Sequence, residues 1–135
     1  MLTKTRHSVF DLEYHFVLIT KYRHPVLTGT LKTRLEDILR TLFTKNFNTT
    51  ILEINIQPDH VHILFSATPT IQLSKLANSV KTVSSRRIRK EFSEELKPYY
   101  WKPLLWSSTY FICSVSERSH EIVQNYIAHQ NANRK

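Results

Sequence analysis

His60 and His62 stand one residue apart near the middle of the chain. Because side chains alternate along a β-strand, both imidazoles are expected on one face of a strand while Val61 lies on the other. Two neighbouring imidazoles can form half of a metal site. Near the C-terminus, Tyr126 and Gln130 are four residues apart in a helical pattern and therefore share a face. Together these residues indicate metal-assisted attack on a phosphodiester by a phenolate.

Each of these residues also has an ordinary structural explanation. A chain with seven histidines can produce one spaced pair by chance. A tyrosine on an apolar helix face, as at Tyr126, is more often a core residue with its hydroxyl at the rim, and Gln130 would normally lie on the surface. Imidazole ligands also leave the ion open, because they admit zinc or nickel as well as Mg²⁺ or Mn²⁺.

The elements that must position these residues alternate between strand and helix patterns. A nearly continuous β-branched and aromatic run predicts a strand at 14–20, and apolar alternation predicts strands at 52–57 and 60–65. A further strand is expected at 110–115, and helical spacing predicts helices at 31–43, 71–92 and from 119 onward. We expect N-caps at Thr30 and Ser119, an inward face of Leu52, Ile54 and Ile56, and a last apolar helix face of Ile122, Val123, Tyr126 and Ile127. The order β-α-β-β-α-β-α predicts an α+β, ferredoxin-like or RRM-like antiparallel sheet with an additional C-terminal helix carrying the tyrosine.

Length and composition bound the class of protein. At 135 residues the chain is expected to form one domain, 1–135. No apolar run approaches the roughly 18 residues of a membrane span, so no membrane partner is expected. The N-terminus lacks the pattern of a secretory signal and Cys113 is the only cysteine, which favours a cytoplasmic setting. The single glycine, Gly29, excludes glycine-rich phosphate loops, so no nucleotide cofactor is expected.

The net charge of +8 favours a polyanionic partner, because basic side chains release counterions when they meet phosphates. The candidate phosphate contacts are Lys21, Arg23, Lys81, Arg86, Arg87, Arg89 and Lys90. A basic helix is most often a solvated face, and nucleic-acid contact is at least as good an interpretation here. The nearby aromatic residues could cap the core or stack on unpaired bases, and core packing is the preferred interpretation for Trp101 and Trp106.

Taken together, these segments resemble the single-tyrosine transposases of small bacterial and archaeal insertion sequences, the IS200-like family within the HUH class of nucleases. The resemblance extends over nearly the whole chain. It rests on residues 15–23, 58–62, 84–92 and 105–111, and on Tyr126 with Gln130. This chain carries Ser116-Glu117-Arg118, Thr82 and Lys102-Pro103 where relatives commonly have glycine.

The resemblance implies specific roles. His60, His62 and Gln130 would bind Mg²⁺ or Mn²⁺, and Tyr126 would be the nucleophile. The implied activity is cleavage of single-stranded DNA, which gives a 5′-phosphotyrosine and a free 3′-hydroxyl, followed by strand transfer. The implied substrate carries hairpin ends, and the implied assembly is a homodimer. The chain between His62 and Tyr126 is long enough for a site assembled within one subunit or between two.

Two other classes of protein remain open on the sequence. An RRM-like sheet with exposed aromatic residues and basic flanks could bind single-stranded nucleic acid without catalysis. A metal-dependent hydrolase of small phosphoesters could use His60 and His62 with water, which would leave Tyr126 and the basic helix without a purpose.

Overall fold

A computed structural model describes residues 2–4 and 9–131 and contains a four-stranded antiparallel sheet in the order β4-β5-β3-β6. The strands are β3 (Glu13–Ile19), β4 (Thr50–Gln57), β5 (His60–Ser66) and β6 (Phe111–Ser114). The long helices are α1 (Gly29–Thr41), α2 (Leu73–Glu91) and α4 (Ser119–His129). The short elements are β1 (Thr3–Lys4), β2 (Val9–Phe10), η1 (Lys21–Arg23), η2 (Leu42–Asn46) and α3 (Ser93–Leu96).

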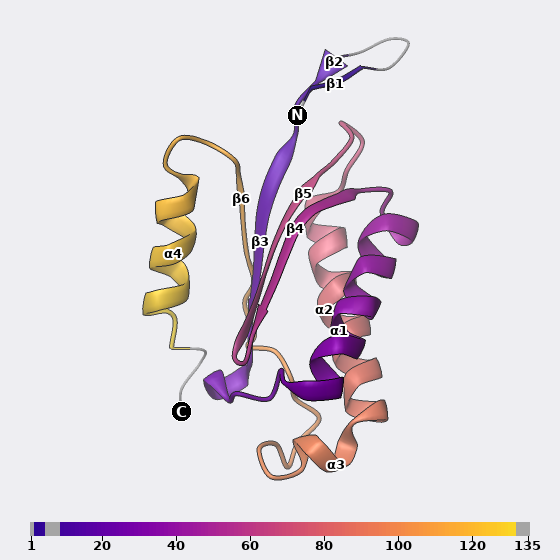
Figure 1. Cartoon of the computed structure of the whole chain (residues 1–135), viewed down its shortest axis with the longest axis vertical. Helices are drawn as coiled ribbons and strands as arrows, with labels where there is room; N and C mark the ends of the chain where they lie inside the picture. Colours follow the sequence, from indigo (N-terminus) through magenta and orange to yellow (C-terminus); the bar gives the residue numbers. More distant parts are fainter. Residues whose placement is uncertain (1, 5–8, 132–135) are drawn as a thin grey trace.

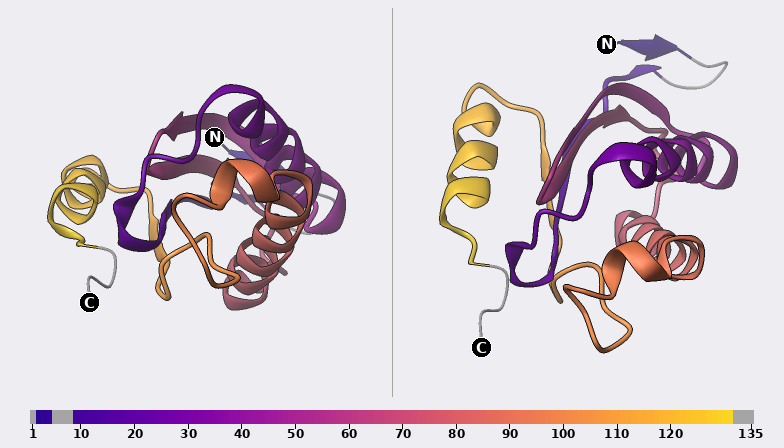
Figure 2. Two further views of the ribbon diagram at one scale, coloured as in Figure 1. Left: turned by 90° about the horizontal axis from the view of Figure 1, so that it is seen from below. Right: turned by 60° about the horizontal axis from the view of Figure 1, so that its bottom comes forward.

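Helices α1 and α2 cover one face of the sheet, and α4 lies against the opposite face (Figures 1 and 2). The element order and strand order are those of the ferredoxin-like fold with one added helix, so the predicted fold class is confirmed. The alternation predicted for β5 is also confirmed. Val61, Ile63 and Phe65 are buried, whereas His60 and His62 are half-buried.

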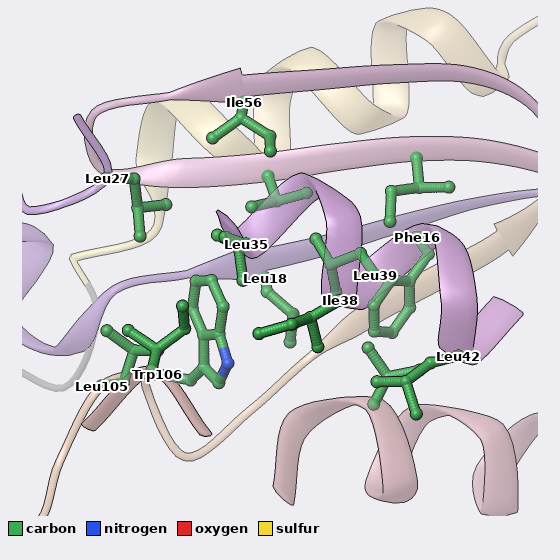
Figure 3. Packing of buried hydrophobic residues seen from close by; sticks show 14 of the residues in the cluster. Phe16, Leu18, Leu27, Leu35, Ile38, Leu39, Leu42, Ile56, Leu105 and Trp106 are labelled. Atoms are coloured by element: carbon green, nitrogen blue, oxygen red, sulfur yellow. The ribbon is translucent and has the colours of Figure 1, made fainter. Parts of the chain in front are cut away.

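The main core lies between the sheet and the helix pair α1 and α2 (Figure 3). Apolar residues recur along α1 at positions three and four apart, so Leu35, Ile38 and Leu39 project from one side of the helix onto Phe16 and Leu18 of β3. All five of these side chains are almost completely buried. A smaller cluster of Val17, Ile19 and Val123 lies on the other face, between β3 and α4.

Strand β4 departs from simple alternation at Leu52. Ile51 pairs with Phe65 and Glu53 with Leu64, so Leu52 is an extra residue in a β-bulge. The bulge shifts the phase of the strand, with the result that Ile51 packs on the core and Leu52 is exposed. The prediction that Leu52 shares the inward face of Ile54 and Ile56 was therefore wrong.

Three predicted helix features also differ. Helix α1 begins at Gly29, whose positive φ of 59° turns the chain into the helix, and its N-cap is Thr28, not Thr30. Helix α2 begins at Leu73, because Ile71 is held in a preceding turn by its N–H bond to the Thr68 carbonyl at 3.1 Å. On α4, Val123 is completely buried whereas Ile122 is 39% exposed, so Ile122 does not belong to the buried face.

Leu35→Ala is expected to lower the free energy of unfolding by about 2–5 kcal/mol, because it removes a completely buried side chain from the interior of α1. Urea denaturation followed by circular dichroism measures the change. The matched control is Leu2→Ala, at a largely exposed position, which is expected to stay within about 0.5 kcal/mol of the unmodified chain. Equal losses in the two variants would contradict this assignment of the core.

No helix in the described ranges, 2–4 and 9–131, combines the length and the apolar character needed to cross a membrane.

Candidate active site

His60 and His62 lie on the face of the sheet that also carries α4. The strand register sets His60 opposite Ile19 and His62 opposite Val17, both on β3. Ile19 and Val17 in turn pack against Val123 of α4. The two imidazoles therefore lie beside the strip of sheet that α4 covers, one strand away from it.

His60 is oriented by the residue before it. Its Nδ1 lies 2.8 Å from Oδ1 of Asp59, and Nε of Arg23 donates to Oδ2 of Asp59 at 3.1 Å. Burial raises the pKa of the Asp59 carboxyl, but hydrogen bonds from His60 and Arg23 outweigh burial and hold this pKa below its usual range. An ionised Asp59 accepts the Nδ1 proton, so Nε2 of His60 is the ring nitrogen that remains for another partner. His60 is thus suited to ligate a cation through Nε2.

His62 is oriented by a second chain of contacts. Its Nε2 lies 2.9 Å from Nδ1 of His15, whose Nε2 lies 3.1 Å from Oγ of Ser119 in the first turn of α4. Burial is the main cause that lowers the pKa of both His15 and His62, so both rings are neutral at neutral pH. The rings also stack, with centroids 5.1 Å apart.

The protons in this second chain can be ordered. We assign them from the Ser119 hydroxyl, which donates to the Ser116 carbonyl at 3.0 Å and in this arrangement accepts a proton from Nε2 of His15. With this assignment Nδ1 of His15 accepts from Nε2 of His62, and the lone pair of His62 is on Nδ1. The predicted N-cap role of Ser119 was wrong, because its hydroxyl bonds to Ser116 and His15 and the N-cap is Arg118.

Tyr126 packs over β6. Its ring stacks on Phe111 with centroids 4.7 Å apart, and its hydroxyl lies 3.4 Å from Oγ1 of Thr109. Phe111 pairs with Val17, which pairs with His62 on its other side. Tyr126 and His62 therefore lie on one face of the sheet but over different strands, with β3 between them. Within the described residues, no hydrogen bond joins the phenol to either candidate histidine.

Gln130 follows the last residue of α4 as its C-cap. Its N–H donates to the Tyr126 carbonyl at 3.0 Å, and its own carbonyl accepts from Nη1 of Arg23 at 2.9 Å. Because Arg23 also bonds Asp59, Gln130 lies at the same end of the sheet as His60. The structure thus brings Gln130 toward the hairpin of β4 and β5 that carries His60 and His62, called the histidine hairpin below, while Tyr126 stays over β6.

Among the described residues, no group of three or more His, Cys, Asp or Glu side chains could hold a metal ion. Any cation site at the histidine hairpin would accordingly combine the two imidazoles with an oxygen donor such as the Gln130 amide. His60 offers Nε2 and His62 offers Nδ1 as nitrogen donors, so the residues present fit such a cation.

Two of the candidate phosphate contacts lie close together although they are far apart in the sequence. Nζ of Lys81 donates to the Ser108 carbonyl at 2.9 Å. Burial lowers the pKa of Lys81, and the positive charge of Lys21 lowers it further. The effect of Lys21 on Lys81 indicates that the two ammonium groups lie near each other.

The other candidate contacts differ in how far they are engaged within the chain. Arg86 and Lys90 are exposed on α2, and Nε of Arg89 donates to Oγ of Ser85 at 3.1 Å. Arg87 is half-buried and lies close enough to Glu91 to lower the pKa of that carboxyl, after the larger effect of Arg34. Arg23 differs from all of these, because its guanidinium bonds Asp59 and the end of α4.

The two tryptophans have opposite environments. Trp106 is buried in the main core, and its Nε1 donates to Oγ of Ser84 at 2.9 Å, as the preferred interpretation predicted. Trp101 is 88% exposed, and Nζ of Lys102 lies 4.8 Å from the centre of its ring. The interpretation of Trp101 as a core residue was therefore wrong.

The sequence alone did not reveal the residues that orient the histidines. His15, Asp59 and Ser119 come from three separate parts of the chain, and only the strand register and the docking of α4 bring them to the site. One signal was available for His15, because it alternates with Val17 and Ile19 along β3 and so shares their face. Its partner on β5 could not be known without the register.

Known proteins resemble this chain over nearly its full length. The ISDra2 transposase TnpA of Deinococcus radiodurans is 37% identical over 96% of this chain and 91% of its own length. The transposase for insertion sequence element IS200 of Salmonella typhimurium is 31% identical over 92% of this chain and 80% of its own length.

Solved structures give the same result. A crystal structure of a candidate transposase from Deinococcus radiodurans R1 superposes with a TM-score of 0.84 at 35% identity, covering 96% of this chain and 98% of that one. A REP-associated tyrosine transposase bound to a REP hairpin shares the fold at a TM-score of 0.53 and 14% identity, covering 94% of this chain and 74% of that one. The family model described as "Transposase IS200 like" matches residues 8–130, and the chain belongs to this transposase family.

Proposed function

We propose that this transposase cleaves and rejoins single-stranded DNA with hairpin ends, using Tyr126 as the nucleophile and a divalent cation, Mg²⁺ or Mn²⁺, held by His60, His62 and Gln130. The observation that carries the proposal is the orientation of the histidine pair. Each imidazole is held through one ring nitrogen by its own hydrogen-bond chain, leaves the other ring nitrogen for a ligand, and lies on the face of the sheet against which the Tyr126 helix packs.

In the proposed reaction, Tyr126 attacks the phosphate and the histidine pair with Gln130 holds the cation. A phenol attacks poorly until its proton leaves, so Tyr126 must lose that proton as its oxygen bonds to phosphorus. The bond from phosphorus to the 3′ oxygen breaks in the same exchange, and that oxygen takes up a proton to become a free 3′-hydroxyl. A bound cation would act as a Lewis acid on the phosphate and stabilise charge on the departing oxygen. Attack by a 3′-hydroxyl on the phosphotyrosine reverses these bond changes and reseals the strand.

In the position that the structure gives it, Tyr126 must still be brought to the histidines before it can attack. Because the phenol stacks on Phe111 of β6, a shift of α4 across β3 or a second copy of the chain must bring a tyrosine to the histidines. The proposed homodimer supplies the second route. Neither route requires a change in the sheet, since the histidines already lie beside the strip that α4 covers.

The test uses two labels on one hairpin-bearing single strand, incubated with the protein and Mg²⁺ or Mn²⁺. With a 3′ label, an SDS-resistant protein–DNA adduct should appear, because the tyrosine bonds the 5′ phosphate of the downstream fragment. With a 5′ label, a shortened fragment with a free 3′-hydroxyl should appear in equal yield. Cleavage without an adduct would favour the hydrolase, and binding without cleavage would favour the RRM-like module.

Charge reversal at Arg86 and Arg87 is expected to weaken binding of the hairpin and to flatten its salt dependence, by about one unit of slope for each lost phosphate contact. Fluorescence anisotropy at several salt concentrations measures both effects. Lys32→Glu with Arg40→Glu is the matched control, because it makes the same charge change on the exposed side of α1. An equal loss of salt-dependence slope in the control would mean that the change reflects net charge and not contacts made by Arg86 and Arg87.

Trp101→Ala is expected to lower affinity for a strand with unpaired bases by about tenfold and to leave affinity for a blunt duplex little changed, because an exposed indole can stack on a free base. Binding should also quench tryptophan fluorescence in the unmodified chain, since Trp106 is buried and Trp101 is the accessible reporter. Trp101→Phe should recover most of the affinity. Unchanged binding in Trp101→Ala would remove Trp101 from the DNA surface.

A further inference from the structure

Arg23 lies where three parts of the chain meet. Its Nε donates to Oδ2 of Asp59 in the turn before β5, at 3.1 Å. Its Nη1 donates to the backbone carbonyls of Ile127 and Gln130, at the C-terminal end of α4, the second at 2.9 Å. Carbonyls at a helix C-terminus lack partners within the helix and carry partial negative charge, so a guanidinium is suited to cap them. The side chain is only 21% exposed.

The backbone is held in an unfavourable conformation to present this side chain. Tyr22 and Arg23 have φ values of 61° and 56°, in the left-handed region that residues with a Cβ rarely adopt. Such a turn persists only when its surroundings fix it. Here the Lys21 carbonyl accepts from the Tyr100 hydroxyl at 2.7 Å, and the Arg23 N–H donates to the Thr20 carbonyl at 3.0 Å. The strained turn directs the Arg23 side chain toward Asp59 of the histidine hairpin and toward the C-terminal end of α4.

The contacts continue from Arg23 to a candidate ligand. Asp59 uses one carboxylate oxygen for Arg23 and the other for Nδ1 of His60, at 2.8 Å. The last turn of α4 is thereby linked to His60 through two side chains. Arginine suits this link better than lysine, because Nε and Nη1 donate in different directions from one rigid plane, whereas the ammonium of a lysine is a single point.

We propose that Arg23 is a positioning residue that fastens the last turn of α4 to the histidine hairpin and aligns His60 through Asp59. This replaces the phosphate-contact role that the sequence suggested for Arg23, since its guanidinium is already occupied by the chain's own acceptors. The alignment of His60 rests on the proposed function, because it matters only if His60 is a metal ligand. The fastening of α4 does not depend on the proposed function.

The test measures the free protein, so it does not depend on DNA cleavage. The variants are Arg23→Gly and Arg23→Lys. Glycine adopts the positive φ of this position without cost, so Arg23→Gly removes the guanidinium while it relieves the backbone. Arg118→Ala is the matched control, because the ion pair of this exposed arginine within residues 2–4 and 9–131 is a long one, 4.0 Å, to Glu121. Hydrogen exchange of the α4 amides and Mn²⁺ binding by calorimetry are measured on each.

Arg23→Gly is expected to speed amide exchange in residues 126–130 at least tenfold and to weaken Mn²⁺ binding about tenfold, the effect typical of losing an outer contact of a metal ligand. Arg23→Lys should give a smaller change in both. Asp59→Asn should weaken Mn²⁺ binding but keep α4 protected, since Arg23 still reaches the helix carbonyls. The Arg118→Ala control should match the unmodified chain.

Unchanged exchange in α4 of a folded Arg23→Gly protein would overturn the fastening role. Loss of hairpin binding in that variant, with normal exchange and normal Mn²⁺ affinity, would return Arg23 to the phosphate contacts and overturn the proposal. A failure of the proposed function is distinguishable, because it would appear in the unmodified chain as absence of Mn²⁺ binding and of the DNA adduct. Faster α4 exchange in Arg23→Gly would then still support the fastening.

Discussion

Tyr126→Phe is expected to abolish the covalent DNA adduct, with a loss of cleavage of at least about a thousandfold, because removal of an essential nucleophile has effects of this size. Hairpin affinity should stay within about twofold, since phosphate contacts dominate such binding. The fold should also be preserved. Phenylalanine keeps the ring that stacks on Phe111 and loses only the long contact, 3.4 Å, to Thr109. Denaturing electrophoresis of the 3′-labelled strand gives the measurement.

Tyr99→Phe is the matched control, because it removes a hydroxyl from a partly exposed tyrosine elsewhere on the surface. It should form the adduct at the normal rate. Persistence of the adduct in Tyr126→Phe would assign the covalent bond to another residue. Mixing Tyr126→Phe with His62→Ala adds information on assembly, since recovered activity in the mixture would mean that a tyrosine from one copy serves the histidines of another.

His62→Ala is expected to reduce cleavage to background while hairpin binding stays largely intact. The substitution removes a neutral donor whose free lone pair lies on Nδ1, and it removes no cation that could meet a phosphate. Mn²⁺ affinity should fall together with cleavage, and calorimetry without DNA measures it directly. Loss of DNA binding by a folded His62→Ala protein would contradict the role of a ligand.

His120→Ala provides the control for His62→Ala, because His120 is an exposed histidine close enough to His15 and His62 to lower their pKa values. It should leave cleavage and Mn²⁺ affinity within about twofold. A comparable loss in both variants would indicate that the electrostatic environment of the histidine hairpin matters more than ligation by His62.

Much of the fold was predictable because strong local patterns and the final structure agree. Alternation placed His60 and His62 on one face of β5, and the spacing of Leu35, Ile38 and Leu39 placed α1 on the core. Leu52 was misplaced because a β-bulge depends on the partner strand, which a single strand does not encode locally.

The candidate site was only partly predictable for a related reason. Spacing can show that residues share a face, as for Tyr126 and Gln130, but it cannot show what that face covers. The stacking of Tyr126 on Phe111 depends on how α4 docks on the sheet. The hydrogen bonds of Arg23 within the chain depend on a turn in which Tyr22 and Arg23 both have positive φ values. Neither residue is glycine, so residue propensities do not predict this turn.

Helix α4 is tied to the sheet near both of its ends, through Ser119 to His15 at the first turn and through Arg23 at the last. If one of these contacts breaks, the other still holds its end of the helix. In the proposed mechanism, a movement of α4 that carries Tyr126 toward the histidines would also disturb the contacts that orient them, those of His62 at the Ser119 end and those of His60 at the Arg23 end.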